Sequence, residues 1–198
     1  MTKENFVYEL NNTLYINLTN RCTNSCNFCI RNNHNSVGGK ELWLTREPSF
    51  EDVIAQLPEN VRAYKEAVFC GFGEPTCRLE VLTKVGKHLK TLGMAVRLNT
   101  NGQGNLFHGR DITGDLAVAV DIVNVSLNAS NAKEYQRICQ SEYGDNSFNA
   151  MLDFAKLCKE KGLEVIMSVI DIIGKKEIAA CQKLCEEKNL NLRVRTYE

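Results

Sequence analysis

Residues 21–31 read RCTNSCNFCIR and place three thiols, those of Cys22, Cys26 and Cys29, in one short stretch at spacings of four and three residues. The run TLYINLT at residues 13–19 comes just before this stretch and has the apolar and β-branched content of a strand. Thiolate is the soft ligand that iron prefers, so such a loop can hold one face of an iron-sulfur cube and leave one iron without a protein ligand. A zinc knuckle is the alternative, although zinc needs a further ligand and more often has paired CxxC spacings.

Outward from this stretch, strand-like runs alternate with helical patterns. Strands are expected at residues 13–19, 67–70, 95–100, 121–127, 163–170 and 190–197. Helices are expected at residues 49–57, 79–92, 132–139, 147–161 and 175–188. Gly93 and Gly162 follow two of these helices, as left-handed C-caps prefer. Alternation of this kind predicts parallel strands joined by right-handed crossovers.

These strand-helix units predict an α/β fold, a partial (β/α)6 TIM-type barrel. A doubly wound open sheet fits the periodicity almost as well. We favour the barrel because polar motifs follow the strands at their C-terminal ends, where α/β folds carry their sites. No linker, repeat or low-complexity tract interrupts the sequence, so residues 1–198 are expected to form a single domain.

The composition excludes some classes of function. Lys and Arg together number 24 and so do Asp and Glu, so bulk charge gives no support for a nucleic-acid or membrane partner. No run approaches the roughly eighteen apolar residues that span a bilayer. Nine cysteines beside an N-terminus without an apolar run favour a reducing compartment in which thiols serve metals. We therefore expect a cytoplasmic protein.

Polar motifs follow the second, third and fourth strands. In GFGEPT, Gly71 and Gly73 would let the backbone approach a ligand closely, although the motif by itself is also typical of a tight turn. The third strand runs into NTNG at residues 99–102. In the fourth, Ser126 and Asn128 alternate with apolar residues and so point to one face. Polar caps that close the strands are the alternative for these last two motifs.

The whole order of motifs resembles a known family. Cys22, Cys26, Phe28 and Cys29 match the signature of the radical S-adenosylmethionine (SAM) superfamily, CxxxCxxC with an aromatic residue before the last cysteine. Over nearly the whole chain, the succession of RCTNxCxFCIR, VGGxxLWL, VFCGFGEPTxRL, RLNTNGxGNLxHGRD and VSLNA resembles the TatD-linked (TatD-associated) radical SAM proteins. GFGEP departs from the superfamily's GGEP because Phe72 replaces the second glycine.

The resemblance implies a radical SAM enzyme. A 4Fe-4S cluster would reductively cleave SAM to a 5'-deoxyadenosyl radical, which would abstract hydrogen from an unknown small-molecule, nucleotide or peptide substrate. An electron donor such as flavodoxin or ferredoxin would supply the electron. The implied cluster ligands are Cys22, Cys26 and Cys29. The implied SAM-binding residues are Phe28, Gly71, Gly73, Glu74, Asn99, Asn101, Ser126, Asn128 and Ile172. Ile170 is a second candidate against the adenine, and for both isoleucines a place in the core is an equal alternative.

Other polar residues are candidates for substrate contact. His108 and Arg110 lie on a glycine-bracketed loop and could clamp a phosphate or carboxylate, although His108 could also cap the barrel rim. Asp171 ends an apolar run, where an acid needs a partner or solvent. Arg195 shares a face of the last strand with Arg193 and lies nearer the barrel mouth.

The rival hypothesis is a non-catalytic iron-sulfur or zinc protein that assists a TatD-type nuclease system. A full zinc site that drew Cys70 or Cys77 as its fourth ligand would support it. The remaining four cysteines sit in helical patterns and are expected to be structural, because free cysteine is often buried. They are Cys139, Cys158, Cys181 and Cys185.

Overall fold

The computed structural model describes residues 4–197, and its main feature is a seven-stranded sheet in the order β1-β2-β5-β6-β7-β8-β9. The strands are β1 Val7–Leu10, β2 Thr13–Ile16, β5 Ala67–Phe69, β6 Val96–Thr100, β7 Ile122–Ser126, β8 Glu164–Ile170 and β9 Asn191–Arg195. β1 is antiparallel to β2, and all later neighbours in this sheet are parallel. The predicted α/β fold with a mostly parallel sheet is confirmed.

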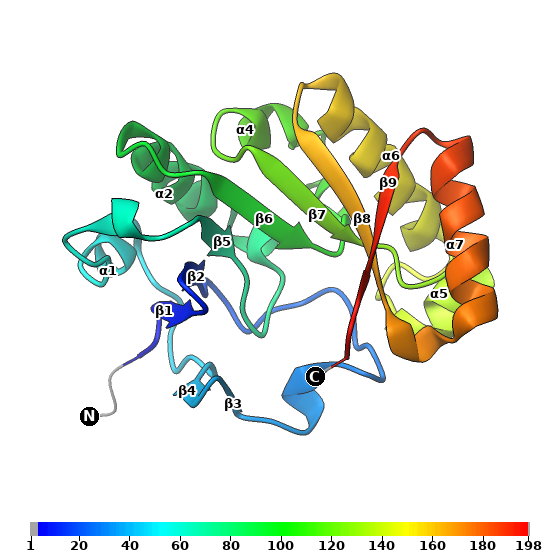
Figure 1. Cartoon of the computed structure of the whole chain (residues 1–198), viewed down its shortest axis with the longest axis horizontal. Helices are drawn as coiled ribbons and strands as arrows, with labels where there is room; N and C mark the ends of the chain where they lie inside the picture. Colours follow the sequence, from blue (N-terminus) through cyan, green and yellow to red (C-terminus); the bar gives the residue numbers. More distant parts are fainter. Residues whose placement is uncertain (1–3, 198) are drawn as a thin grey trace.

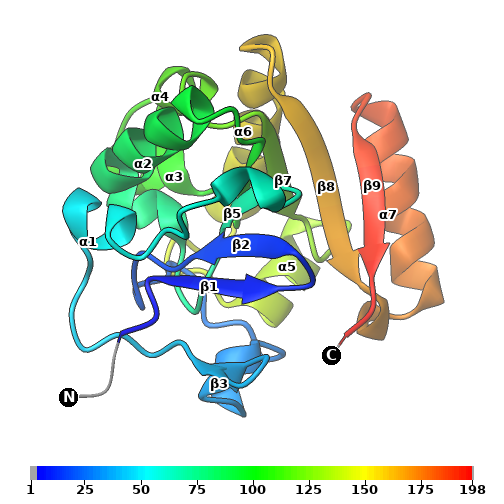
Figure 2. The same ribbon diagram turned by 60° about the vertical axis from the view of Figure 1, so that its left-hand side comes forward.

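The helices pack on one side of the curved sheet (Figures 1 and 2). They are α1 Phe50–Ile54, α2 Leu79–Thr91, α3 Gly104–His108, α4 Thr113–Ala117, α5 Ala132–Cys139, α6 Asn146–Glu160 and α7 Lys175–Glu187. On α2, buried Leu82, Val85 and Leu89 recur at helical spacing and join the main core. None of the helices within residues 4–197 is both long and apolar enough to cross a membrane.

The strand order decides between the two architectures that the periodicity allowed. A doubly wound sheet reverses its strand order at a switch point. Here the parallel strands β2 to β9 follow one another in sequence order without a reversal. Since each crossover then continues in the same direction, the doubly wound alternative is wrong and the partial barrel fits. β1 and β9 are the edges of this sheet.

The sequence reading missed strand β1. Its register pairs Val7 with Ile16 and Leu10 with Thr13, across a two-residue turn at Asn11 and Asn12. Both asparagines have positive φ, 50° and 61°, which suits the tight hairpin turn. The hairpin covers the outer side of β2, where a barrel strand would otherwise be exposed.

The two faces of the sheet differ in chemistry. Leu98, Val125 and Met167 point into the main core beneath the helices. The alternate residues form what we call the inner face, on the side away from the helices. Neighbouring register pairs place Arg97, Asn99, Asn124, Ser126, Ser168, Arg193 and Arg195 on it. The inner face is therefore polar along most of β6, β7 and β9.

The connection that follows the cysteines, residues 32–46, is packed against the rest of the chain. It contains a small hairpin, β3 Ser36–Val37 with β4 Lys40–Glu41. Beyond the hairpin, Leu42 is buried against Tyr8 and Phe72. The carbonyl of Leu42 accepts a hydrogen bond of 2.8 Å from Asn17 Nδ2.

Candidate functional site

The cysteine loop is held in place by an arginine inside it. The guanidinium of Arg31 donates to the carbonyls of Asn20, Asn24 and Phe72 at 3.2–3.3 Å. Asn20 comes just before the cysteine loop, Asn24 lies between Cys22 and Cys26, and Phe72 belongs to the GFGEP turn. One charged side chain thus fixes the path of the cysteine loop against its neighbour.

A buried glutamine supports the loop from below. Gln103, 1% exposed, accepts hydrogen bonds from Thr23 and Ser141 through Oε1 and donates to Asn24 and Tyr135 through Nε2, at 2.8–3.0 Å. All four of its partners have low exposure. Because buried polar groups are costly when left unpaired, this network specifies one conformation for the backbone between Cys22 and Cys26.

The GFGEP turn needs its glycines because the cysteine loop lies so close. A Cβ on Gly73 would come within 2.3 Å of the Thr19 carbonyl oxygen and 2.6 Å of that of Arg21. The backbone N–H of Glu74 donates to the same Arg21 carbonyl at 2.7 Å. A Cβ on Gly71 would meet Asn17 Oδ1 at 2.1 Å. These glycines therefore permit close packing of two loops.

The carboxylate of Glu74 is fully engaged by the chain itself. Although buried, it accepts four hydrogen bonds of 2.7–3.1 Å, from the N–H and hydroxyl of Thr76, the hydroxyl of Thr100 and the N–H of Asn101. It ties the turn after β5 to the end of β6. A contact from this segment to SAM would then come from backbone atoms.

Asn101 extends this connection to the cysteines. Its Nδ2 donates to Thr23 Oγ1 at 2.8 Å and lies 3.9 Å from Cys22 Sγ. Its Oδ1 accepts from the N–H of Gln103 at 2.9 Å. The predicted cofactor residue Asn101 thus positions the cysteine loop.

The three thiols are partly buried and protonated at neutral pH. Burial raises the pKa of Cys22 to about 12 and also raises that of Cys29. The pKa of Cys26 is raised chiefly by its hydrogen bond to the buried thiol of Cys139, and the same bond lowers the pKa of Cys139. Iron binding would displace these protons, because the ligand is thiolate.

The thiols are not yet gathered as a metal site. Within residues 4–197, no group of three or more His, Cys, Asp or Glu side chains converges in a way that could hold a metal ion. To bind iron, the thiol of Cys26 would have to give up its hydrogen bond to Cys139. The donor set itself fits an iron-sulfur cluster, since it consists of three partly buried thiols on one loop held by Arg31 and Gln103.

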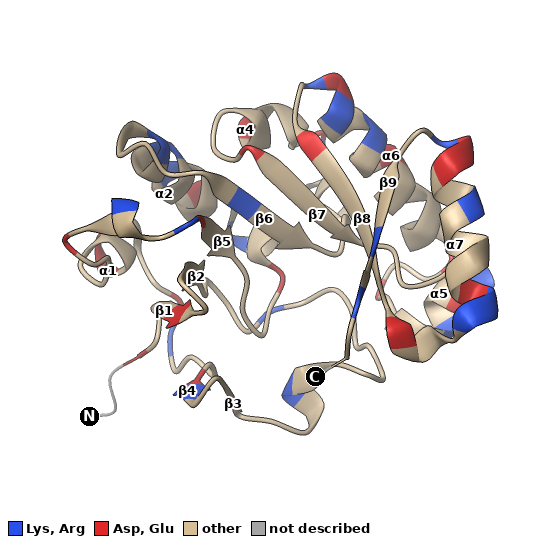
Figure 3. Cartoon of the chain, in the orientation of Figure 1, with Lys and Arg blue, Asp and Glu red and all other residues tan. Residues whose placement is uncertain are grey.

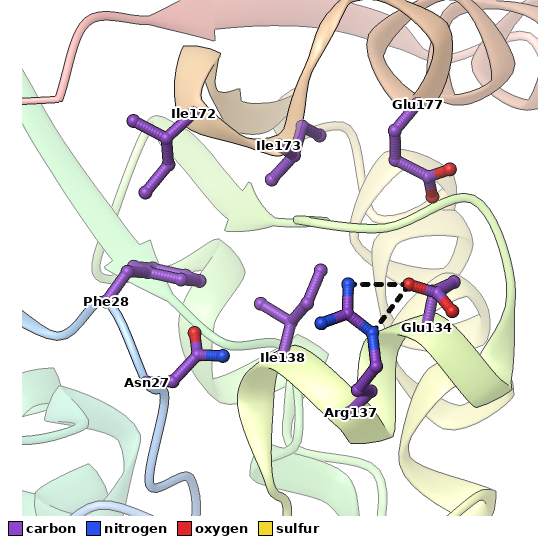
Figure 4. A pocket seen from close by; sticks show the side chains of 8 residues that line it. All are labelled: Asn27, Phe28, Glu134, Arg137, Ile138, Ile172, Ile173 and Glu177. Atoms are coloured by element: carbon purple, nitrogen blue, oxygen red, sulfur yellow. Dashed lines mark hydrogen bonds and ion pairs between the residues drawn. The ribbon is translucent and has the colours of Figure 1, made fainter.

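A cavity of about 270 Å³ opens beside this loop. Phe28 of the loop and Ile172 face each other across it (Figure 4), and both were predicted to bind SAM. Its lining is Asn27, Phe28, Glu134, Arg137, Ile138, Ile172, Ile173 and Glu177. Ile172 is 52% exposed, which is unusual for so large an apolar side chain and leaves it free to cover a flat apolar ligand. The cavity therefore presents two apolar side chains, those of Phe28 and Ile172, to a flat apolar ligand.

The wall of the cavity is fixed by polar contacts. Glu134 and Arg137 of α5 form an ion pair at 2.8 Å. Glu177, near the start of α7, accepts a hydrogen bond of 2.6 Å from the N–H of Ser130. This bond connects α7 to the loop after β7, where Asn128 lies.

The end of β7 presents unsatisfied polar groups. Asn128 is buried with φ of 57°; its Nδ2 lies 3.7 Å from Cys139 Sγ, and its Oδ1 has no partner. Ser126 makes no side-chain hydrogen bond within the described part of the chain. Both residues therefore keep polar groups without a protein partner at this end of the sheet, and their contact with SAM stays a prediction. The side chain of Asn99 already has one partner, since its Oδ1 accepts a hydrogen bond of 2.8 Å from the guanidinium of Arg97.

Two of the proposed substrate residues have other partners. A ring nitrogen of His108 is hydrogen-bonded to the Thr76 carbonyl at 2.8 Å, which fits the rim-closing alternative. Arg110 is exposed and paired with Asp115 at 2.7 Å. These contacts account for both residues without a ligand, so the anion clamp receives no support from them.

The other two candidates lie near the cavity. Asp171 begins the 3-10 turn η4, Asp171–Ile173, and its Oδ1 accepts 3.1 Å from the N–H of Tyr197. Arg195 is on the inner face, opposite Ile170 of β8. Its Nε is buried without a partner.

Several site residues were missed by the sequence reading. Arg31, Gln103 and Cys139 support the loop, while Ile138, Ile173 and Glu177 line the cavity. Arg31 was visible in the quoted stretch, but its three carbonyl partners come together only in the folded chain. Cys139 was expected to be structural; it is buried, and its thiol also contacts a predicted cluster ligand.

Comparison with known proteins agrees with this geometry. A protein-family model described as the radical SAM superfamily matches residues 16–184. No protein with a curated description matches the sequence.

Solved structures share the fold at low identity. SuiB of Streptococcus suis, bound to S-adenosylmethionine, has a TM-score of 0.66 and 16% identity, over 93% of this chain and 38% of that chain. The protein anSMEcpe with bound AdoMet has a TM-score of 0.60 and 16% identity, over 93% of this chain and 50% of that chain. A radical SAM methyltransferase from Sphaerobacter thermophilus has a TM-score of 0.59 and 15% identity, over 96% of this chain and 68% of that chain. The chain thus spans half or less of the length of the first two.

Proposed function

The chain belongs to the radical SAM superfamily, and from this premise we propose that it is an enzyme that reductively cleaves SAM at a 4Fe-4S cluster. The cluster and SAM, when bound, supply carbon-sulfur bond cleavage and abstraction of hydrogen from a substrate. The observation that carries the proposal is the cavity shared by Phe28 of the three-cysteine loop and Ile172 of η4. Because Phe28 precedes the predicted ligand Cys29 in the chain, a ring bound in this cavity would lie beside the predicted cluster ligands.

The residues of this chain would divide the work of binding. Cys22, Cys26 and Cys29 would hold the cluster, and Phe28 with Ile172 would enclose the adenine. Ser126 and Asn128 offer a hydroxyl and an unpaired amide oxygen for the polar part of the ligand. Glu74 and Asn101 would act by fixing loops, since their side chains are bonded within the chain.

The finer assignment concerns the subfamily and the partners. The order of motifs supports placing the chain among the TatD-associated radical SAM proteins, with residues 1–198 as one domain. A flavodoxin or ferredoxin would reduce the cluster. The substrate would be a small molecule, nucleotide or peptide, because the balanced charge of the chain gives no general attraction for a nucleic-acid polymer.

The test is SAM cleavage by the reconstituted protein. The protein would be loaded anaerobically with iron and sulfide, reduced with dithionite in the presence of SAM, and assayed by chromatography for 5'-deoxyadenosine. Wild type and the matched control Cys181→Ala, which removes a buried thiol of α7, should both form it. Cys26→Ala should form none. A well-loaded wild-type cluster that never cleaves SAM would favour the non-catalytic binding protein instead.

A further inference from the structure

The inner face of the sheet carries more positive than negative charge: Arg195 ends β9, Arg193 precedes it on the same face, and Arg97 lies near the start of β6. Figure 3 shows basic residues on β6 and on β9, with none on β7 and β8 between them. The residues concerned are Arg97, Arg193 and Arg195. The acidic residue of β8, Glu164, is paired in register with Ile122 at the start of the strand, about 20 Å from the level of Arg195 at 3.3 Å per residue.

Only one of these arginines is neutralised by a neighbour. Arg97 makes two hydrogen bonds to Glu66, at 2.7 and 2.9 Å, and both side chains are less than one-fifth exposed. A third bond, to Asn99, fixes its orientation. Within residues 4–197, Arg193 and Arg195 make no ion pair. The positive charge without an ion-pair partner on this face is therefore that of β9.

Arg195 has the properties of a binding group that lacks its ligand. Its side chain is half-buried, and the buried Nε has no hydrogen-bond partner. Burial lowers the pKa of this guanidinium, with Arg193 and Arg97 adding like-charge repulsion. This half-buried guanidinium makes no ion pair within residues 4–197, which makes an anionic partner favourable here.

The position of Arg195 is next to the proposed reaction site. Its register partner Ile170 is the last residue of β8 and leads directly into η4, whose Ile172 lines the cavity. The bond from Tyr197 N–H to Asp171 holds the segment after β9 against the same turn. A group bound by Arg195 would thus lie on the inner face beside the cavity.

We propose that Arg195, with Arg193 beside it, binds a carboxylate or phosphate group of a reactant on the inner face of the sheet. The inference rests on the proposed function in that the anion belongs to a molecule taking part in that reaction. A guanidinium suits such a group because its planar fork donates two parallel hydrogen bonds to a carboxylate or phosphate. The anion comes either from the substrate or from the methionyl carboxylate of SAM.

The experiment measures binding by the reconstituted full chain, without turnover. Equilibrium dialysis would follow labelled inorganic phosphate in the presence of saturating SAM, and labelled SAM in separate cells. The variants are Arg195→Gln, Arg195→Lys and the control Arg62→Gln, whose exposed guanidinium donates to the Leu92 carbonyl. Thermal unfolding followed by circular dichroism would confirm that each variant is folded.

If the site takes a substrate anion, Arg195→Gln weakens phosphate binding about tenfold or more, as the loss of a charged hydrogen bond implies, and leaves SAM binding unchanged. Arg195→Lys retains part of the affinity, and Arg62→Gln retains all of it. If the anion is SAM's own carboxylate, Arg195→Gln weakens SAM binding by a similar factor, and phosphate competes with SAM. Unchanged binding of both ligands in folded Arg195→Gln overturns the proposal.

These outcomes are separable from those of the cleavage assay. Arg195-dependent binding in a protein that never forms 5'-deoxyadenosine would refute the proposed function and leave the anion subsite standing. Normal 5'-deoxyadenosine formation, together with phosphate and SAM binding that does not change in Arg195→Gln, would support the proposed function and refute the anion subsite.

Discussion

At the scale of single residues, the ion pair between Glu66 and Arg97 decides the charge of the inner face. Hydrogen bonding to Arg97 holds the pKa of Glu66 below its usual value. A carboxyl with a lowered folded-state pKa contributes stability above its unfolded pKa, and the contribution is lost as the pH falls through the folded pKa. The pair therefore makes the stability of the sheet sensitive to acid.

Replacing this carboxylate gives a pH-dependent prediction. Glu66→Gln should lower the free energy of unfolding by about 1–3 kcal/mol at pH 7, because Arg97 loses its partner in a half-buried place. The difference from wild type should shrink below about pH 4, where the wild-type carboxyl also becomes protonated. Urea unfolding at several pH values measures this. The control Glu160→Gln removes an exposed acid 3.8 Å from Lys156 and should change little at any pH.

A difference between Glu66→Gln and wild type that stayed the same from pH 7 to pH 3 would refute the assigned role of the ion pair.

The sequence predicted the residues that carry chemistry better than the residues that support them. Cysteine spacing identifies a ligand set, because the chemistry of the thiol itself is distinctive. Gln103 and Cys139 act through partners far away in the chain, such as Thr23 and Cys26, and no local pattern marks such contacts. His108 is a different case: its chemistry suggested a substrate contact, but its ring is hydrogen-bonded to the backbone carbonyl of Thr76.

At the scale of elements, the six parallel strands and the longer helices were predicted within a few residues of their ends. Periodicity is a strong signal where a segment has one buried face. β1, α3 and α4, each four or five residues long, were missed. The order of the strands in the sheet, which the sequence left open, comes from how the crossovers pack.

The close approach of two loops gives the prediction at this scale. Gly73→Ala places a Cβ against the Thr19 and Arg21 carbonyls, so the GFGEP turn must move away from the cysteine loop. We expect iron content after reconstitution and 5'-deoxyadenosine formation each to fall at least about tenfold, a loss equivalent to about 1.4 kcal/mol. Gly114→Ala on α4 is the matched control, because a Cβ there meets nothing within 4 Å. Equal losses in the two variants would show that the turn does not depend on this contact.

At the scale of the whole molecule, one end of the sheet collects everything that the proposed function needs. The cysteine loop follows β2, the GFGEP turn follows β5, and Asn128 and η4 follow β7 and β8. Parallel strands in sequence order bring these segments to the same edge, although they are spread over some 150 residues of sequence. The proposed anion-binding residue Arg195 ends β9 at this same edge, on the inner face.

The most direct test of the account is the electron paramagnetic resonance spectrum of the reduced, reconstituted protein recorded before and after addition of SAM. Three cysteine ligands leave one iron of the cluster open, so SAM binding at that iron should change the g values of the spectrum. A spectrum that is identical with and without saturating SAM would contradict the account, because it would mean that SAM does not reach an open iron in this protein.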